Sequence, residues 1–168
     1  NRDPETAEHI WNRVLEVDPN YSEAYNRLGY LYLSQGRYEE AEAAMRKYAF
    51  VAPDLANPHD SLGEVLMNVG RYEEAEAEFA RALAKQPDDF PWSQVNIGRV
   101  YLLRGQVTKG VKLLTDVRQV LRDTRWERII ALTTTRALFE HGLMDQLNDH
   151  SLHFVQAFPD DDSTPYIR

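Results

Sequence analysis

Cysteine is absent from this 168-residue sequence, which excludes disulfide frameworks, Cys-ligated zinc sites, iron–sulfur clusters and thiol nucleophiles. Long hydrophobic runs are also missing: no stretch of about 18 apolar residues occurs, so we predict no membrane insertion. Positive charge is scarce, with 19 Lys and Arg residues against 27 Asp and Glu residues and a formal net charge of −8. Because phosphate binding requires a basic surface, this balance argues against nucleic-acid binding.

Motifs that mark common catalytic and cofactor sites are missing as well. The sequence contains no P-loop, GxGxxG, GxSxG or HExxH pattern. His150 and His153 have the spacing of two metal ligands on a helix, but no third ligand is defined, and an exposed helix end without a metal is the simpler interpretation. We therefore predict that the chain is not an enzyme and uses no cofactor or metal.

What the sequence does have is an internal repeat. The segment GRYEEAEA occurs at residues 36–43 and again at residues 70–77, an offset of 34 residues. Seven of the eight glycines fall on two columns of this repeat, namely Gly29, Gly63 and Gly98, and Gly36, Gly70, Gly105 and Gly142. A repeat of this length is one supersecondary unit, so the chain is predicted to stack several copies of it.

Each repeat has the pattern of two helices. Residues 22–35 carry apolar and small residues at helical spacing, which predicts an amphipathic helix. Gly36 ends this helix, because glycine tolerates the left-handed conformation of a helix C-cap. Residues 38–51 predict a second helix, which Pro53 ends. The two form an antiparallel pair, and one pair cannot bury its apolar face without neighbours.

Glycines also lie inside the first helices of the repeats. Gly29, Gly63 and Gly98 occupy this position, where glycine costs about 1 kcal/mol relative to alanine. We explain them by a close approach of the second helix, and we expect Ala41 and Ala75 to face the glycines there.

The first helix of the next repeat is predicted to begin at Asn57, as the N-cap, with Pro58 at the first helical position. His59 follows and takes the position of Tyr25 in the preceding repeat. We therefore predict that His59 is packed in the core and is not a metal ligand.

This pattern resembles the tetratricopeptide repeat (TPR) family, and the resemblance covers essentially the whole chain. It rests on columns that recur in three units: Leu28, Gly29, Tyr32, Ala41, Tyr48 and Pro53; Leu62, Gly63, Ala75, Phe79, Ala82 and Pro87; and Ile97, Gly98 and Tyr101. The resemblance implies an all-α fold, a right-handed superhelix of stacked antiparallel helix pairs with about 4.5 repeats.

We predict a single TPR solenoid domain over residues 1–168. Its parts are a half repeat at 1–19, repeats at 22–55, 56–89 and 91–123, a divergent repeat or cap at 124–160, and a solvated tail at 161–168. The half repeat lacks its first helix and the sequence does not begin with Met, so we expect a processed protein or part of a longer chain. Thr134 and Thr135 replace the Leu-Gly pair of the other units, so the packing of the last unit is expected to differ.

The resemblance implies that the first helices line a concave groove, which in this family receives a peptide or a helix of another protein. The predicted groove residues share one stripe of these helices: Asn26, Tyr30, Leu33, Asp60, Glu64, Met67, Val95, Arg99, Leu102 and Arg136. Tyr, Met and Arg often anchor interfaces. The alternative is that this stripe is simply solvated.

Charge is unevenly distributed along the chain. Residues 1–87 carry 16 acidic and 9 basic side chains, whereas residues 99–136 carry 3 acidic and 9 basic ones. Arg118, Arg122 and Arg125 would share one helix face. Such a basic face would receive an acidic partner segment, or would let copies of the chain meet head to tail as a homo-oligomer. The alternative is a solvated basic face.

The sequence therefore supports one leading function and two alternatives. The leading one is a protein–protein interaction scaffold that binds a peptide or helical segment in its groove. The alternatives are a regulatory or substrate-presenting TPR arm of a larger enzyme, such as a kinase or a transferase, and a self-assembling TPR oligomer. The compartment is not determined, and the cytoplasm is the default expectation.

Overall fold

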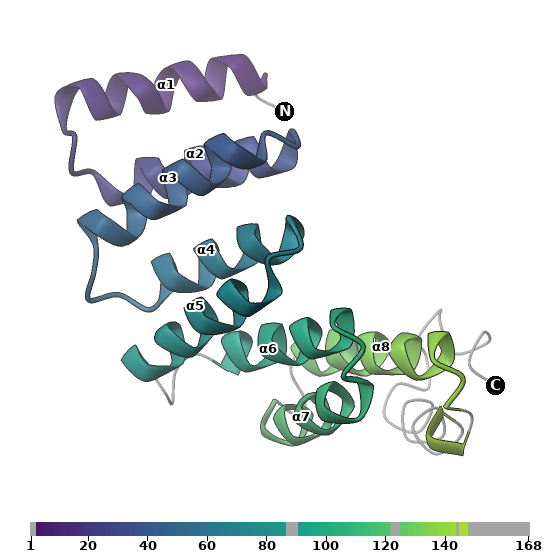
Figure 1. Ribbon diagram of the computed structural model, residues 1–168. Helices are drawn as coiled ribbons and strands as arrows, with labels where there is room; N and C mark the ends of the chain where they lie inside the picture. Colours follow the sequence, from purple (N-terminus) through teal and green to yellow (C-terminus); the bar gives the residue numbers. More distant parts are fainter. Residues whose placement is uncertain (1–2, 87–90, 122–124, 144, 148–168) are drawn as a thin grey trace. The chain divides into compact units, whose positions relative to one another are not determined.

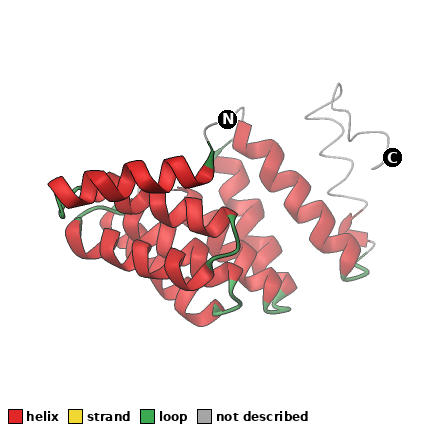
Figure 2. Ribbon diagram, turned by 90° about the horizontal axis from the view of Figure 1, so that it is seen from above, coloured by secondary structure: helices red, strands yellow, loops and turns green. Residues whose placement is uncertain are grey.

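The computed structural model describes residues 3–86, 91–121, 125–143 and 145–147, and all regular secondary structure in these ranges is helical (Figures 1 and 2). The labelled helices are α1 (Pro4–Val17), α2 (Ser22–Ser34), α3 (Tyr38–Val51), α4 (Asn57–Asn68), α5 (Tyr72–Lys85), α6 (Pro91–Leu103), α7 (Val107–Val120) and α8 (Arg125–Glu140). The prediction of an all-α fold built from helix pairs is confirmed.

The chain divides into two compact units, residues 1–93 and 94–168. In the N-terminal unit, α2 packs on α3 and α4 packs on α5. α3 also contacts α4, and α1 contacts α2, so successive pairs are stacked. In the C-terminal unit, α7 packs on α8. Each helix thus covers the apolar face of a neighbour, as the repeat pattern requires.

The turns between paired helices are built on glycine. Gly36 and Gly70 have φ angles of 73° and 79°, and Gly105 and Gly142 repeat this left-handed conformation at 71° and 66°. After α2, the Arg37 N–H reaches back to the Tyr32 carbonyl oxygen at 2.9 Å, which satisfies a carbonyl at the helix end. The predicted glycine caps are therefore confirmed.

The start of α4 differs from the sequence prediction by one position. Asn57 is already the first helical residue, Ala56 occupies the N-cap position and Pro58 is the second helical residue. The Asn57 side chain does not cap the helix, because its Nδ2 group donates a hydrogen bond to the Tyr48 hydroxyl on α3, at 3.0 Å. Asn57 therefore connects two repeats.

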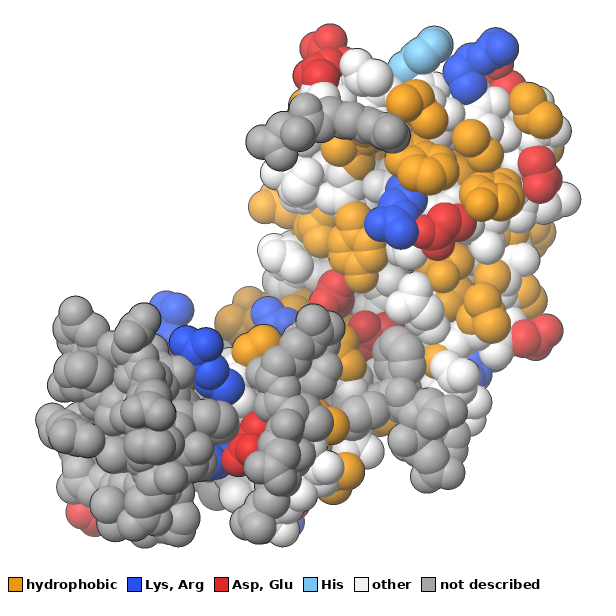
Figure 3. All heavy atoms as spheres, turned by 180° about the vertical axis from the view of Figure 1, so that it is seen from behind, with side chains coloured by type: hydrophobic (Ala, Val, Ile, Leu, Met, Phe, Trp, Pro, Cys, Tyr) orange, Lys and Arg blue, Asp and Glu red, His pale blue; other side chains and the backbone are white. Residues whose placement is uncertain are grey.

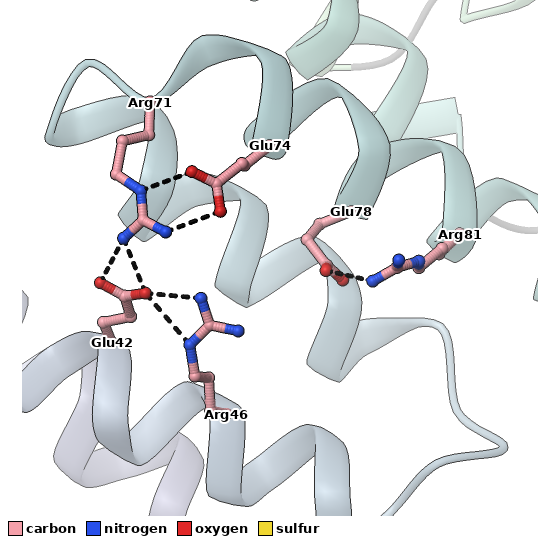
Figure 4. A network of polar contacts seen from close by, with 6 residues as sticks. All are labelled: Glu42, Arg46, Arg71, Glu74, Glu78 and Arg81. Atoms are coloured by element: carbon pink, nitrogen blue, oxygen red, sulfur yellow. Dashed lines mark hydrogen bonds and ion pairs between the residues drawn. The ribbon is translucent and has the colours of Figure 1, made fainter.

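His59 is packed as predicted. Its side chain is 15 % exposed, and its Nδ1 atom lies 2.8 Å from Glu78 Oε2 on α5. Glu78 also accepts a hydrogen bond from Arg81, one turn further along α5 (Figure 4). This pair holds the first turn of α4 against α5.

Each glycine within a first helix faces a large side chain of the second helix. A Cβ atom placed on the glycine would lie 2.6, 2.6 and 2.8 Å from the partner side chain in three pairs, respectively Gly29–Met45, Gly63–Phe79 and Gly98–Leu114. Contacts below 3.0 Å essentially never occur for a real Cβ atom. The glycines therefore let the paired helices pack closely, as predicted.

The predicted neighbours of the glycines are corrected by the structure. Ala41 and Ala75 are fully buried, yet the side chains nearest to Gly29 and Gly63 belong to Met45 and Phe79, one turn further along. The physical reason is that the missing Cβ leaves room for a large side chain to fill. Small residues on both helices would leave that space empty.

Arginine in the turn between paired helices links neighbouring repeats (Figure 4). Arg71 precedes α5, and its Nη1 group donates to both carboxylate oxygens of Glu42 on α3, at 2.8 Å each. The same guanidinium binds Glu74 through Nε at 2.7 Å and Nη2 at 2.6 Å. Arg46 adds a further hydrogen bond to Glu42 at 2.7 Å. Charge-assisted, bidentate contacts of this kind fix orientation as well as adding energy.

The same arrangement occurs one repeat earlier. Arg37 donates to Glu8 on α1 at 2.7 Å and to Glu40 on α3. In both linkages the arginine lies 29 positions after the glutamate of the preceding second helix, so the same ion pair recurs in consecutive repeats. These ion pairs align each turn with the second helix of the preceding repeat.

We expect Gly63→Ala to destabilise the chain by about 1–3 kcal/mol, although alanine has the higher helix propensity. The new methyl group would lie 2.6 Å from the buried ring of Phe79, which is rigid. Gly29→Ala is the matched control. Its closest contact is the flexible end of Met45, so its loss should be smaller. Urea unfolding measures both, and equal losses would contradict this explanation.

Arg71→Gln should make the chain less sensitive to acid. Burial raises the pKa of Glu42, but the hydrogen bonds from Arg46 and Arg71 outweigh it, so the pKa lies below its ordinary value of 4.5. A lowered pKa gives stability that is present above about pH 4.5 and is lost as the pH falls through the folded-state pKa. The variant should therefore lose less stability between pH 7 and pH 3.

The measurement is the urea midpoint at several pH values. Arg13→Gln, which breaks the exposed Arg13–Glu16 pair, is the control and should change the acid dependence little. An unchanged pH dependence in Arg71→Gln would show that this linkage does not contribute.

Candidate functional site

The predicted groove residues of α2 and α4 meet at the surface of the N-terminal unit. The Tyr30 hydroxyl on α2 donates to Glu64 Oε2 on α4 at 2.8 Å and lies 3.1 Å from Ser61 Oγ. Tyr30 and Glu64 are 34 residues apart, so they hold the same position in consecutive repeats. Tyr30 remains 39 % exposed. The two first helices therefore present adjoining side chains on one surface.

Tyr30 is a hydrogen-bond donor at any ordinary pH. Partial burial, followed by the negative charge of Glu64, raises the pKa of its hydroxyl above the usual range. The hydroxyl therefore stays protonated and keeps its bond to Glu64. This bond positions the aromatic ring, whose exposed part is available for contact.

Two further predicted residues on α2 are half-buried, Asn26 and Leu33. The Oδ1 atom of Asn26 is buried and makes no hydrogen bond within the part of the chain that the structure describes. We call the four residues Asn26, Tyr30, Leu33 and Glu64 the α2–α4 surface. This surface offers an aromatic ring, an aliphatic side chain and carboxylate oxygens that accept hydrogen bonds. Figure 3 shows hydrophobic side chains with charged ones among them over the N-terminal unit.

Three predicted groove residues lie in the interior instead. Asp60 is 4 % exposed, Met67 5 % and Val95 1 %. Asp60 Oδ1 accepts a hydrogen bond from the buried Ser93 hydroxyl at 2.6 Å. Asp60 and Met67 belong to α4, which is contacted by α2, α3 and α5, so side chains on several of its faces are covered. Val95 belongs to α6. A partner cannot reach these three side chains in this conformation.

In the C-terminal unit the predicted residues lie on two helices. Arg99 on α6 is half-buried and donates to Asn96 Oδ1 at 2.9 Å. Leu102, also on α6, packs against Gly110 of α7. Arg136 on α8 is 80 % exposed and pairs with Glu140 at 2.7 Å. Arg99, Leu102 and Arg136 keep accessible surface.

The predicted basic face is described only in part. Arg118 is 13 % exposed and pairs with Glu127 on α8 at 3.2 Å, so its charge is compensated inside the unit. Arg122 and the side chain of Arg125 lie outside the described residues, as do His150 and His153. Within the described ranges, no group of three or more metal-binding side chains occurs.

Sequence reasoning missed Ser61, which is fully buried and lies beside the Tyr30 hydroxyl. One signal was present: its column of the repeat holds polar residues in all three first helices, Arg27, Ser61 and Asn96. A polar column beside an apolar stripe marks side chains that hydrogen bond between helices.

Helix pairs that recur every 34 residues define a helical repeat protein. Two tetratricopeptide repeat family models match this chain, at residues 10–43 and 56–89. The chain therefore contains tetratricopeptide repeats, and these repeats support a role as a protein–protein interaction scaffold. No curated protein matches the sequence closely enough to count as a relative.

Several solved structures share this fold. PilW, a widely conserved type IV pilus biogenesis factor, is similar with a TM-score of 0.83 and 17 % identity, over 96 % of this chain and 73 % of PilW. YrrB, described as a TPR protein with an unusual peptide-binding site, has a TM-score of 0.70 and 16 % identity, over 97 % of this chain and 82 % of YrrB.

A Thermobaculum terrenum O-GlcNAc transferase variant is also similar, with a TM-score of 0.65 and 26 % identity. The match covers 73 % of this chain but only 24 % of that one.

Among the helices that the structure describes, none combines the length and the apolar character needed to cross a bilayer.

Proposed function

We propose that this chain binds an extended peptide or a helical segment of another protein on the α2–α4 surface. The observation that carries this proposal is the hydrogen bond between Tyr30 and Glu64. It joins equivalent positions of two first helices and holds an exposed aromatic ring beside a carboxylate. Tyrosine supplies a large contact area at little cost in conformational entropy, and it is enriched among interface anchors.

The chemistry of this surface favours a particular kind of segment. Glu64 offers carboxylate oxygens, and the Tyr30 ring and Leu33 offer apolar contact. A segment with an apolar side chain next to a Lys or Arg would satisfy both, because a cation is attracted to a carboxylate and to an aromatic face. We therefore propose that the N-terminal unit binds a basic, amphipathic segment. The similarity to YrrB, described as having a peptide-binding site, supports peptide binding.

We propose a second contact region in the C-terminal unit, formed by Arg99 and Leu102 on α6 and by Arg136 on α8. Arginine side chains together with an aliphatic one would favour an acidic or polar part of a partner. This region is tested separately from the α2–α4 surface.

A second candidate function is that of a TPR arm within a larger enzyme. The similarity to part of the O-GlcNAc transferase favours it, because 73 % of this chain corresponds to 24 % of that protein. In that case the arm would present a substrate or regulate an attached catalytic domain. The two functions differ in whether the partner is a separate protein.

The Tyr30→Ala and Arg99→Glu changes should each weaken partner binding at least tenfold, which corresponds to about 1.4 kcal/mol. Tyr30→Ala removes the exposed ring, and Arg99→Glu reverses a charge on α6. Tyr38→Ala is the matched control, because Tyr38 is exposed to nearly the same extent, 41 % against 39 %, but lies outside the predicted groove. Urea unfolding checks that each variant stays folded.

The partner is found by affinity capture from a lysate of the source organism, using the wild type beside the Tyr30→Ala/Arg99→Glu double variant, with identification by mass spectrometry. Binding constants are then measured for each single variant. A protein that both forms retain equally would refute the proposed surface. A molar mass that increases with protein concentration in light scattering would favour the self-assembling alternative.

A further inference from the structure

Glu64 on α4 is a half-buried carboxylate that lacks a cation. Two other partly buried glutamates of the N-terminal unit, Glu8 and Glu42, are 25 % and 21 % exposed, and each binds an arginine, at 2.7 and 2.8 Å (Figure 4 shows Glu42). Within the described part of the chain, Glu64 forms no ion pair. A charge that loses part of its hydration without gaining a counter-charge is unfavourable. Glu64 is therefore suited to a cation that comes from outside the chain.

The two carboxylate oxygens of Glu64 have different surroundings. Oε2 accepts the hydrogen bond from the Tyr30 hydroxyl at 2.8 Å. Oε1 makes no hydrogen bond within the described ranges, and the buried unpaired side-chain atoms of these ranges belong to Asn26 and Asn96. Oε1 is therefore open to solvent. One oxygen of Glu64 thus holds Tyr30, and the other can accept a charge-assisted hydrogen bond from a ligand.

Ser61 fixes the direction of the hydrogen bond between Tyr30 and Glu64. The Tyr30 hydroxyl has a single proton, which it donates to Glu64, so the Ser61 hydroxyl, 3.1 Å away, is the donor to the Tyr30 oxygen. Ser61 is fully buried and belongs to the same helix as Glu64. α4 therefore holds the end of the Tyr30 side chain through two residues, which keeps the aromatic ring beside the Glu64 carboxylate.

No cation of α2 or α4 competes for Glu64. Arg27 is the only Lys or Arg of these two helices, and it pairs with Glu23 at 2.6 Å. Negative charge is added by Asp60, one turn before Glu64. After burial, the charges of both carboxylates raise the pKa of the Tyr30 hydroxyl, so both act at this point of the surface. The electrostatic potential at Glu64 therefore favours a positively charged ligand group.

We propose that Glu64 determines the specificity of the α2–α4 surface by binding the side chain of one lysine or arginine in the partner segment. The ligand cation contacts Oε1 while Tyr30 stays bound to Oε2, and the apolar stem of the ligand side chain packs on the Tyr30 ring. Ser61 is a positioning residue that acts through Tyr30. This inference rests on the proposed function, because it assigns a single ligand residue to the same surface.

The test is a selection from random dodecapeptides on the immobilised full 168-residue chain, followed by sequencing of the retained peptides. We expect Lys and Arg to be enriched about fivefold at one position, the gain of a partly exposed ion pair worth about 1 kcal/mol. Apolar residues should be enriched beside that position. High salt should reduce the Lys and Arg enrichment more than the apolar one, because salt screens the charge.

Variants at Glu64 separate its charge from its contact with Tyr30. Glu64→Gln keeps an oxygen that accepts from Tyr30 but removes the charge, so it should abolish the Lys and Arg enrichment and retain the apolar one. Glu64→Lys should enrich Asp and Glu instead. Glu39→Gln is the matched control, because it removes the same charge from an exposed glutamate of α3, and it should leave the selection unchanged. Urea unfolding checks that each variant stays folded.

Ser61→Ala tests the positioning role. Loss of its hydroxyl should lower the Lys and Arg enrichment about twofold, as expected for one hydrogen bond, and leave the apolar enrichment unchanged. A general loss of structure would instead lower both enrichments together, which would contradict the positioning role.

Two results would overturn the inference: a Lys and Arg enrichment that survives Glu64→Gln, or retained peptides without any preference for Lys and Arg. If Tyr30→Ala still abolishes retention in the second case, the proposed function stands and the assignment of Glu64 alone is wrong. If the chain retains no peptide, or retains the same peptides after Tyr30→Ala, both the inference and the proposed surface are wrong.

Discussion

The contact between a glycine and a large side chain within each helix pair is the constraint on which the rest of this structure depends. Because Gly29, Gly63 and Gly98 have no side chain, the second helix can insert Met45, Phe79 or Leu114 against the backbone of the first. This close approach costs helix propensity at the glycine, and the buried contact offsets that cost.

Stacking of the pairs depends on a different interaction. Arg37 and Arg71 stand directly after the left-handed glycines, so the turn geometry directs their guanidinium groups toward the preceding second helix. There they bind Glu8 and Glu42. With the pairs aligned in this way, α2 and α4 lie side by side, and Tyr30 can reach Glu64 across the boundary between repeats. The proposed binding surface is thus a consequence of the stacking.

Much of the fold was determined by the sequence alone. The 34-residue period, the glycine caps and the helix pairs are local properties, since each depends on residues close together in the chain. The N-cap of α4 was predicted one residue late, because Asn57 hydrogen bonds to Tyr48 of another helix, and local capping preferences do not include such a partner.

Only the tertiary structure decided which predicted site residues are accessible. Helical spacing assigns Asp60 and Met67 to the same stripe as Glu64, but it does not count the neighbours of α4, and three helices cover it. The sequence predicted Arg118 as part of a basic face, but in the structure Arg118 pairs with Glu127 of α8. Periodicity along one helix defines which side chains share a face, whereas burial depends on what other parts of the chain pack against that face.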